Sequence, residues 1–188
     1  MTTKAVLGLQ LPTDPRWVDL AAMRLEDILT DHAYCEQKAA TTCISLIVSY
    51  PEQTELVQRL SPVVTEEWGH FRMVLEELRK RGFTLGRQRK DAYVNQLMPH
   101  VRKGQGYEAQ LVDRLLVCAL IEARSCERFK LLSEQLEDTS LRAFYRSLMV
   151  SEAGHYRLFV DLAETVQARE VVRERWEALR QAEADILA

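Results

Sequence analysis

The sequence predicts an all-α protein, a four-helix bundle with one long crossover and an extra helix near the C-terminus. Apolar residues recur at steps of three and four along four long stretches, which is the period of an α-helix with one buried face. Glycine and proline number only 7 and 5 in 188 residues, unusually few for an all-β or loop-rich chain. A basic segment that lacks this period separates the four stretches into two pairs.

The length favours a single domain over residues 1–188, with a core large enough to fold alone. No apolar run has the length of a membrane-spanning helix, and the N-terminus lacks the hydrophobic segment of a signal peptide. The cysteines show no Cys-x-x-Cys spacing, which is typical of reduced thiols. We therefore expect a cytoplasmic protein with no membrane partner. The four cysteines are Cys35, Cys43, Cys118 and Cys126.

The first pair of helices is expected at about 25–49 and 52–81. Pro51 ends the first of them, because the residue before a proline disfavours the helical backbone. Pro62 predicts a kink or a break in the second helix, since proline lacks the amide hydrogen that continues the ladder. Gly82 is a plausible residue to close its C-terminus.

The link at 83–106 is the predicted crossover between the two pairs. It carries little helical period beyond a short helix expected at 91–98. Loops of this length inside a compact domain are usually functional or disordered.

The second pair of helices is expected at about 107–136 and 140–166. The turn at 138–140, Asp-Thr-Ser, is a signal for a helix N-terminus. A last helix at 171–186 is expected either to pack across the bundle or to bind a partner. Two helical hairpins joined by one long crossover make the ferritin-like topology.

A repeated motif gives this bundle its predicted chemistry. Glu-x-Gly-His occurs at 67–70 and again at 152–155, and each copy is followed by an aromatic residue and an arginine. Residues three apart lie on one helix face, so each copy presents a carboxylate and an imidazole together. An earlier glutamate lies on an apolar stripe 31 positions before the first copy and 30 before the second. The six predicted metal ligands are Glu36, Glu67, His70, Glu122, Glu152 and His155.

All six residues take stripe positions where a leucine would otherwise stand. Burying an isolated carboxylate costs several kcal/mol, and four close together also repel one another. Two divalent cations would balance four carboxylates, and mixed oxygen and imidazole ligation suits iron or manganese, with zinc left open. One Glu-x-x-His alone is a common surface fragment, but two copies in matched context are not. His32, one turn before Glu36, is either an outer partner of the site or a core histidine, and Tyr34 and Tyr156 are best explained by packing.

A basic segment overlaps the crossover. It has eight Lys or Arg and only one acid, a net charge of +7, so the rest of the chain carries −10. Such a segment favours a polyanion such as a nucleic acid, although a solvated basic loop is the alternative. The predicted nucleic-acid-binding residues are Arg79, Lys80, Arg81, Arg87, Arg89, Lys90, Arg102 and Lys103.

Three stretches resemble a known family: 116–129, 66–71 and 151–156. They are similar to the tRNA hydroxylases that act on 2-methylthio-N6-isopentenyladenosine beside the anticodon, and the similarity runs from about Trp17 to Val166. The resemblance implies a non-haem di-iron monooxygenase with two iron ions held by the six ligands and O2 as co-substrate. It also implies the tRNA anticodon arm as partner, an external electron donor of the ferredoxin type, and no role for DNA.

Three alternatives stay open at this point. A ferritin- or rubrerythrin-like protein that oxidises or stores iron needs the same six ligands, but it does not need a basic crossover. A di-iron oxygenase with a small-molecule substrate and a metal-free helical interaction module are the other two.

Overall fold

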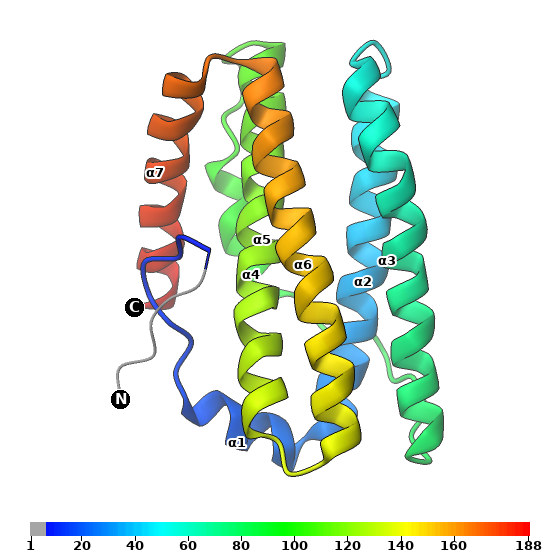
Figure 1. Cartoon of the computed structure of the whole chain (residues 1–188). Coiled ribbons are helices and arrows are strands. Elements are labelled where there is room, and N and C mark those ends of the chain that lie inside the picture. Colours follow the sequence, from blue (N-terminus) through cyan, green and yellow to red (C-terminus); the bar gives the residue numbers. More distant parts are fainter. Residues whose placement is uncertain (1–6) are drawn as a thin grey trace. The chain divides into compact units, whose positions relative to one another are not determined.

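The computed structural model describes residues 7–188, and this part of the chain is all helical, with seven α-helices, one 3-10 helix and no strand (Figure 1). The predicted all-α class is confirmed. Residue contacts divide the chain into two compact units, one formed by Asp19–Lys90 and the other by the residues up to Val18 together with Asp91–Ala188. Across residues 7–188 we find no helix with the length and apolar character needed to cross a membrane.

The unit Asp19–Lys90 is a helical hairpin. Its helices α2 (Leu25–Ser49) and α3 (Thr54–Lys80) pack along each other (Figure 1, blue to blue-green). The short helix α1 (Arg16–Met23) precedes α2 and spans the boundary between the units. The turn between α2 and α3 contains Pro51, as the sequence predicts.

Of the two outcomes expected at Pro62, a break is excluded, because helix α3 continues through this residue. Pro62 is exposed, so water can satisfy the carbonyl that loses its amide partner. The helix ends at Lys80, and Gly82, two residues later, has a φ of 72°. The Gly82 amide donates to the Arg79 carbonyl at 3.1 Å, and the Phe83 amide donates to the Leu78 carbonyl at 3.0 Å. A left-handed glycine just after the last helical turn permits these closing hydrogen bonds.

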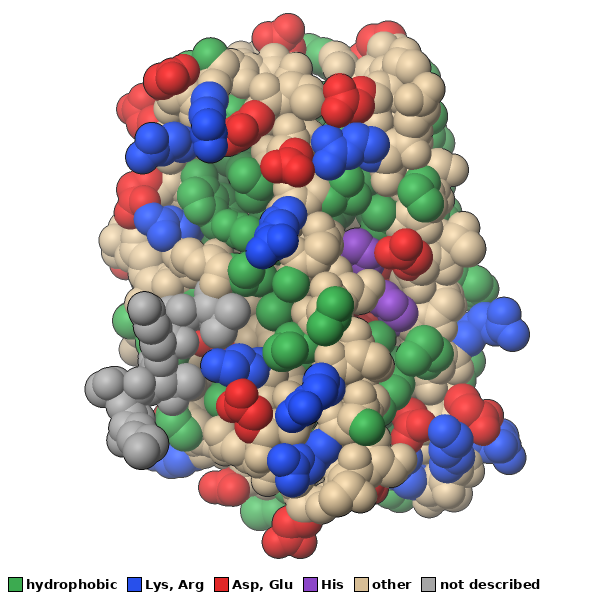
Figure 2. Space-filling model, in the orientation of Figure 1, with side chains coloured by type: hydrophobic (Ala, Val, Ile, Leu, Met, Phe, Trp, Pro, Cys, Tyr) green, Lys and Arg blue, Asp and Glu red, His purple; other side chains and the backbone are tan. Residues whose placement is uncertain are grey.

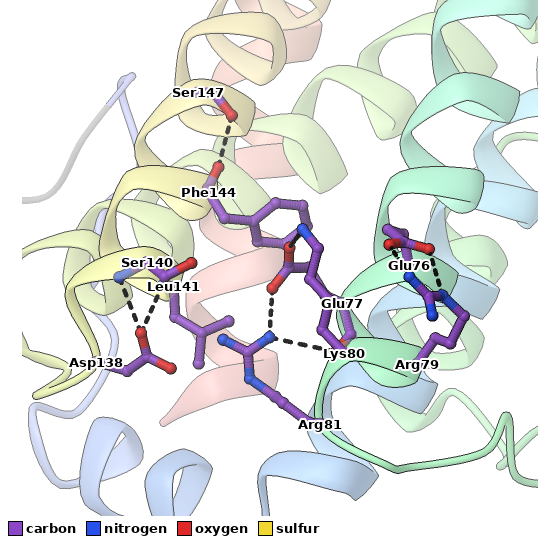
Figure 3. Close-up of polar contacts among 10 residues, drawn as sticks. All are labelled: Glu76, Glu77, Arg79, Lys80, Arg81, Asp138, Ser140, Leu141, Phe144 and Ser147. Atoms are coloured by element: carbon purple, nitrogen blue, oxygen red, sulfur yellow. Dashed lines mark hydrogen bonds and ion pairs between the residues drawn. The ribbon is translucent and has the colours of Figure 1, made fainter.

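The second unit is built on α5 (Tyr107–Gln135) and α6 (Thr139–Val166), which pack along each other. Asp138 starts α6 as predicted: its carboxylate accepts hydrogen bonds from the amides of Ser140 at 2.8 Å and Leu141 at 3.1 Å (Figure 3). Around this pair lie α4 (Ala92–Leu97), the 3-10 helix η1 (Met98–His100) and α7 (Arg169–Leu187). Helix α7 packs against α4, α5 and α6.

A buried arginine on α5, Arg124, forms hydrogen bonds to the N-terminal segment and to α7. Arg124 donates to the Glu183 carboxylate on α7 at 2.7 Å, to the Thr13 hydroxyl at 3.1 Å and to the Leu11 carbonyl at 3.0 Å. It also pairs with Glu127 one turn along α5. Tyr93 of α4 donates to Glu183 at 3.0 Å. One guanidinium therefore ties the N-terminal segment and α7 to α5, and α4 joins the network through Glu183.

The buried acid Asp113 on α5 accepts hydrogen bonds from Arg102, near the end of the crossover. Arg102 donates to Asp113 from its backbone amide at 2.7 Å and from its side chain at 2.9 and 3.0 Å. Arg175 of α7 donates to the same carboxylate at 2.7 and 3.0 Å. Burial opposes ionisation of Asp113, but the hydrogen bonds from Arg102 and Arg175 outweigh it and hold its pKa below the ordinary value.

Candidate metal centre

The unit Asp19–Lys90 brings three of the six predicted ligands together. Glu36 comes from α2, while Glu67 and His70 come from one face of α3, three residues apart. The His70 Nδ1 lies 3.5 Å from Oε2 of Glu36 and 3.5 Å from Oε2 of Glu67. One ligand atom from each residue lies within 4.8 Å of those of the other two. Both glutamates are buried.

The electrostatics of this group show that a positive charge is favoured among the acids. Burial by itself would lower the pKa of His70, but the Glu36 and Glu67 carboxylates outweigh it and raise that pKa to about 10. Burial would raise the pKa of Glu36, but its contacts with His32 and His70 hold that pKa well below the ordinary range. The two carboxylates thus favour a positive charge at His70.

His32 takes part in this group directly. Its Nε2 lies 2.6 Å from Oε1 of Glu36, and both side chains are buried. The sequence left open whether His32 is an outer partner or a core histidine. In the structure it contacts one oxygen of Glu36 while His70 lies near the other, so it fixes how that carboxylate is oriented.

The second unit brings the other three predicted ligands together. Glu122 lies on α5, and Glu152 and His155 lie on α6. All three are buried, and a ligand atom from each lies within 4.8 Å of those of the other two. The His155 Nδ1 is 4.0 Å from Oε2 of Glu152. The two units therefore carry the same half-site, one glutamate opposite a Glu-x-x-His.

The apolar stripe of α6 explains why these side chains face inward. Its buried positions follow the predicted steps of three and four, with Glu152 and His155 between apolar residues. Of the adjacent aromatic residues Phe144 and Tyr145, Tyr145 is the buried one. The buried residues of α6 are Leu141, Tyr145, Leu148, Glu152, His155, Phe159, Leu162 and Ala163.

The contacts of the tyrosines and cysteines singled out in the sequence are those of residues that stabilise the fold. The Tyr34 hydroxyl donates to the Gly86 carbonyl at 3.0 Å, and the Tyr156 ring packs 5.9 Å from the Trp176 ring. The four cysteines, all within the described residues, form no disulfide bonds. Cys126 donates to the Met149 carbonyl at 3.5 Å, and burial together with Glu122 and Glu127 raises its pKa to about 11, so it is an unreactive thiol.

Most of the predicted nucleic-acid-binding residues pair with carboxylates. At the end of α3, Arg79 pairs with Glu76 at 2.6 Å and Lys80 pairs with Glu77 at 2.8 Å (Figure 3). The further pairs are Arg81 with Glu77, Arg89 with Asp27 and Arg102 with Asp113. The other three predicted residues, Arg87, Lys90 and Lys103, are exposed and form no ion pair within residues 7–188. Binding of a nucleic acid by these eight residues stays a prediction.

The donor set of each half-site fits an oxygen-activating metal. Two carboxylates and one imidazole in a buried position match the ligand preference of iron and manganese. Two Glu plus Glu-x-x-His sets, four carboxylates and two imidazoles in all, are the ligands of the two-metal bundles of the ferritin-like class. The structure groups the six predicted residues three by three, and their role as metal ligands stays a prediction. The sequence left open the contact that His32 makes with Glu36.

Comparisons with known proteins identify the family of this chain. The profile of the family described as tRNA-(MS[2]IO[6]A)-hydroxylase (MiaE) matches residues 1–188. A tRNA 2-(methylsulfanyl)-N(6)-isopentenyladenosine(37) hydroxylase of Pseudomonas putida KT2440 is 37% identical over 179 residues, which cover 95% of this chain and 86% of the relative. A protein of the same name from Salmonella typhimurium LT2 is 28% identical, over 95% of this chain and 83% of its own.

A solved structure shares the fold. It is described as protein 43 with aldehyde deformylating oxygenase activity from Synechococcus, is 38% identical, and covers 96% of this chain and 89% of its own with a TM-score of 0.91. The fold of this chain is accordingly the ferritin-like all-α fold. With the family profile matched along its whole length, the chain belongs to the tRNA-(MS[2]IO[6]A)-hydroxylase (MiaE) family.

Proposed function

We propose that this chain is an O2-dependent monooxygenase that hydroxylates the isopentenyl group of 2-methylthio-N6-isopentenyladenosine next to the tRNA anticodon. The observation that carries the proposal is the repeated half-site, a Glu-x-x-His with a third buried glutamate in each unit. The relatives from Pseudomonas and Salmonella, named for this reaction, support the choice of substrate. Because tRNA is the proposed substrate, we expect the reaction in the cytoplasm.

The two half-sites would hold two iron ions. Their four carboxylates carry a formal charge of −4, which two divalent ions balance, and the neutral imidazoles add no charge. Bound iron supplies activation of O2, so that one oxygen atom enters a C–H bond and the other leaves as water, with two electrons from an external donor of the ferredoxin type. The ligand residues are Glu36, Glu67, His70, Glu122, Glu152 and His155.

The chain's own residues prepare these positions. The contact of His32 with one oxygen of Glu36 leaves the other oxygen turned toward His70. The stripe of α6 keeps Glu152 and His155 in an apolar, buried position, which limits access of water. A proton on His70, stabilised by Glu36 and Glu67, stands where a metal cation would bind and must leave when one does.

The test is the nucleoside composition of prenylated tRNA after incubation with iron-loaded protein, a reductant and O2. We expect one added oxygen atom on the isopentenyl group, taken from isotopically labelled O2 and not from water. Omitting O2 and substituting Glu122→Ala are the two controls. Unmodified tRNA in the complete reaction, with iron bound, would refute the proposal.

The structural neighbour supports a second candidate, an oxygenase that deformylates an aldehyde. Formate release from an aliphatic aldehyde, measured with the same iron-loaded protein, distinguishes this activity from tRNA hydroxylation. The relatives reported above are named for hydroxylase or oxygenase activity, which favours an enzyme over the iron-storage alternative.

A further inference from the structure

The outer face of α6 between Arg142 and Arg157 is basic and free of acids. Arg146 and Arg157 are exposed on it, and Arg142 is partly exposed. The stretch contains 16 residues, and its two ends lie roughly 22 Å apart along the helix. Its single acid, Glu152, is buried on the opposite side of the helix. We call this surface the α6 outer face.

The charge of the α6 outer face is not cancelled by carboxylates. Arg146 and Arg157 form no ion pair within residues 7–188, and Arg142 donates its Nε to the Ser133 carbonyl at 3.0 Å and so keeps its charge. The basic segment near the crossover is different, because five of its eight cations have carboxylate partners. Desolvated or paired cations contribute little to recruiting a polyanion, whereas unpaired exposed cations contribute most.

The middle of the α6 outer face carries small side chains. Val150 is 67% exposed. One helical turn later, the same face carries the small residues Ala153 and Gly154. The Ser147 hydroxyl is turned back onto the Phe144 carbonyl at 2.7 Å (Figure 3). A Cβ added at Gly154 would meet nothing within 4 Å, so packing does not require this glycine. In Figure 2, Lys and Arg side chains lie along the path of α6, with hydrophobic side chains between them.

We propose that the α6 outer face is the surface that binds the phosphate backbone of the RNA substrate, with phosphates near Arg142, Arg146 and Arg157. This inference rests on the proposed function, and it adds an RNA contact on α6 to the three exposed cations of the basic segment that form no ion pair within residues 7–188. The same turns of α6 carry Glu152 and His155 on their inner side, so an RNA stem-loop held on this helix lies close to one half-site.

The chemistry of the surface favours RNA over an acidic protein. Protein interfaces are centred on large apolar or aromatic anchors that fill pockets. Between Arg142 and Arg157 the exposed large apolar side chain is Val150, and the larger Phe144, Met149 and Tyr156 are partly buried. RNA binding instead gains most of its affinity from cations that displace counterions from phosphates, and small side chains let the backbone approach closely.

The test measures binding of a prenylated anticodon stem-loop RNA to iron-loaded protein over a range of salt concentrations. Arg146→Gln and Arg157→Gln are the variants, and Arg173→Gln on α7 is the matched control, since Arg173 is also exposed and unpaired within residues 7–188. Each α6 variant is expected to weaken binding about five- to eightfold at about 0.1 M salt and to reduce the slope of log affinity against log salt by about 0.7–0.9. Arg173→Gln is expected to bind as the unmodified chain does.

Two results would overturn the inference. One is unchanged affinity and salt slope in both α6 variants, particularly if Arg87→Gln with Lys90→Gln weakens binding instead. The other is unchanged RNA affinity with slower electron delivery from an acidic donor protein, which would make this face a protein-docking surface. Iron content and far-UV circular dichroism of the variants verify that the fold is retained. Because binding is measured without turnover, failure of this inference is separate from failure of the hydroxylase proposal, which is decided by the nucleoside product.

Discussion

Two clusters of buried polar side chains lie on α5, and they differ in how their negative charge is balanced. Glu127 is fully enclosed with Arg124, and Thr13 donates to the same carboxylate oxygen at 2.7 Å. Glu122, five residues earlier, is grouped with Glu152 and His155, two carboxylates to one imidazole. The first cluster contains a guanidinium, which is always positively charged. The second contains an imidazole in place of a permanent cation.

This difference in charge balance separates a cluster suited to stabilising the fold from a cluster suited to binding a cation. A buried acid that keeps a guanidinium partner fastens segments of the chain, and removing the partner leaves an uncompensated charge. A buried acid grouped with a second acid and an imidazole is suited to an external cation. We therefore expect substitutions in the two clusters to affect different observables.

The largest effect is expected for Glu122→Ala. Loss of this ligand should remove iron from the site and lower hydroxylation more than about 100-fold, since even outer partners of metal ligands cost 10- to 100-fold. The metal-free protein should be no less stable, because one of two crowded carboxylates is gone. Iron content, nucleoside analysis and urea unfolding measure the three quantities. Glu67→Ala in the other unit should behave in the same way.

Glu127→Ala is the matched control on the same helix. It should retain bound iron and lose stability, because Arg124 then has one carboxylate partner fewer. Normal turnover in Glu122→Ala, or loss of iron in a folded Glu127→Ala protein, would contradict the distinction between the two clusters.

Next in size is Arg124→Leu, which leaves Glu127 and Glu183 buried without their cation. We expect a loss of about 3–5 kcal/mol in the free energy of unfolding, measured by urea denaturation of the metal-free protein. Arg146→Leu on the exposed side of α6 is the control and should stay within about 0.5 kcal/mol of the unmodified chain. An equal loss in both variants would show that the network of Arg124 adds nothing specific.

The Arg124 network also shows where sequence reasoning ends. The four long helices were predictable because their apolar period is local, and the six proposed ligands could be picked out because each stands on such a stripe. Arg124 lies in the same stretch of sequence as Glu122. Its partners Glu183 and Thr13 are 59 and 111 positions away, so no local sequence pattern predicts that Arg124 is buried.

The remaining differences have separate reasons. Eight cations counted along 79–103 predict a free basic patch, but the count leaves out Glu76 and Glu77, which lie just before the segment and pair with Arg79, Lys80 and Arg81. Asp27, 62 positions from Arg89, pairs with it only after folding. Pro62 was expected to kink or break α3, and the helix continues through it on an exposed side, which depends on packing. The basic α6 outer face was not predicted, because its arginines are spread over 16 residues.

A smaller effect that depends on pH is expected for Asp113→Asn. Asp113 has a pKa below its ordinary value, so its ionised form stabilises the folded state above the ordinary Asp pKa of about 3.9. That stabilisation is lost as the pH falls through the lowered pKa. At pH 7 the substitution should cost about 1.5–3 kcal/mol, the value of hydrogen bonds to charged groups.

Urea unfolding of both proteins from pH 7 down to pH 3 measures the Asp113 contribution. The difference between them should be constant near neutral pH and should shrink in the acid range, because the unmodified chain takes up a proton at Asp113 there and the variant does not. A difference that does not change with pH would mean that the pairing of Asp113 with Arg102 and Arg175 does not depend on its charge.

The smallest effect concerns the two glycines that precede the histidines of the repeated motif. Neither Gly69 nor Gly154 has an atom within 4 Å of an added Cβ, and both are inside helices. Alanine at either position should stabilise the protein by about 0.5–1 kcal/mol, because glycine loses more conformational freedom in a helix. If the α6 outer face binds RNA, Gly154→Ala should also weaken binding of the stem-loop while the stability rises. A Gly154→Ala protein that is more stable and binds RNA as before would mean that the backbone of the RNA does not approach this turn of α6.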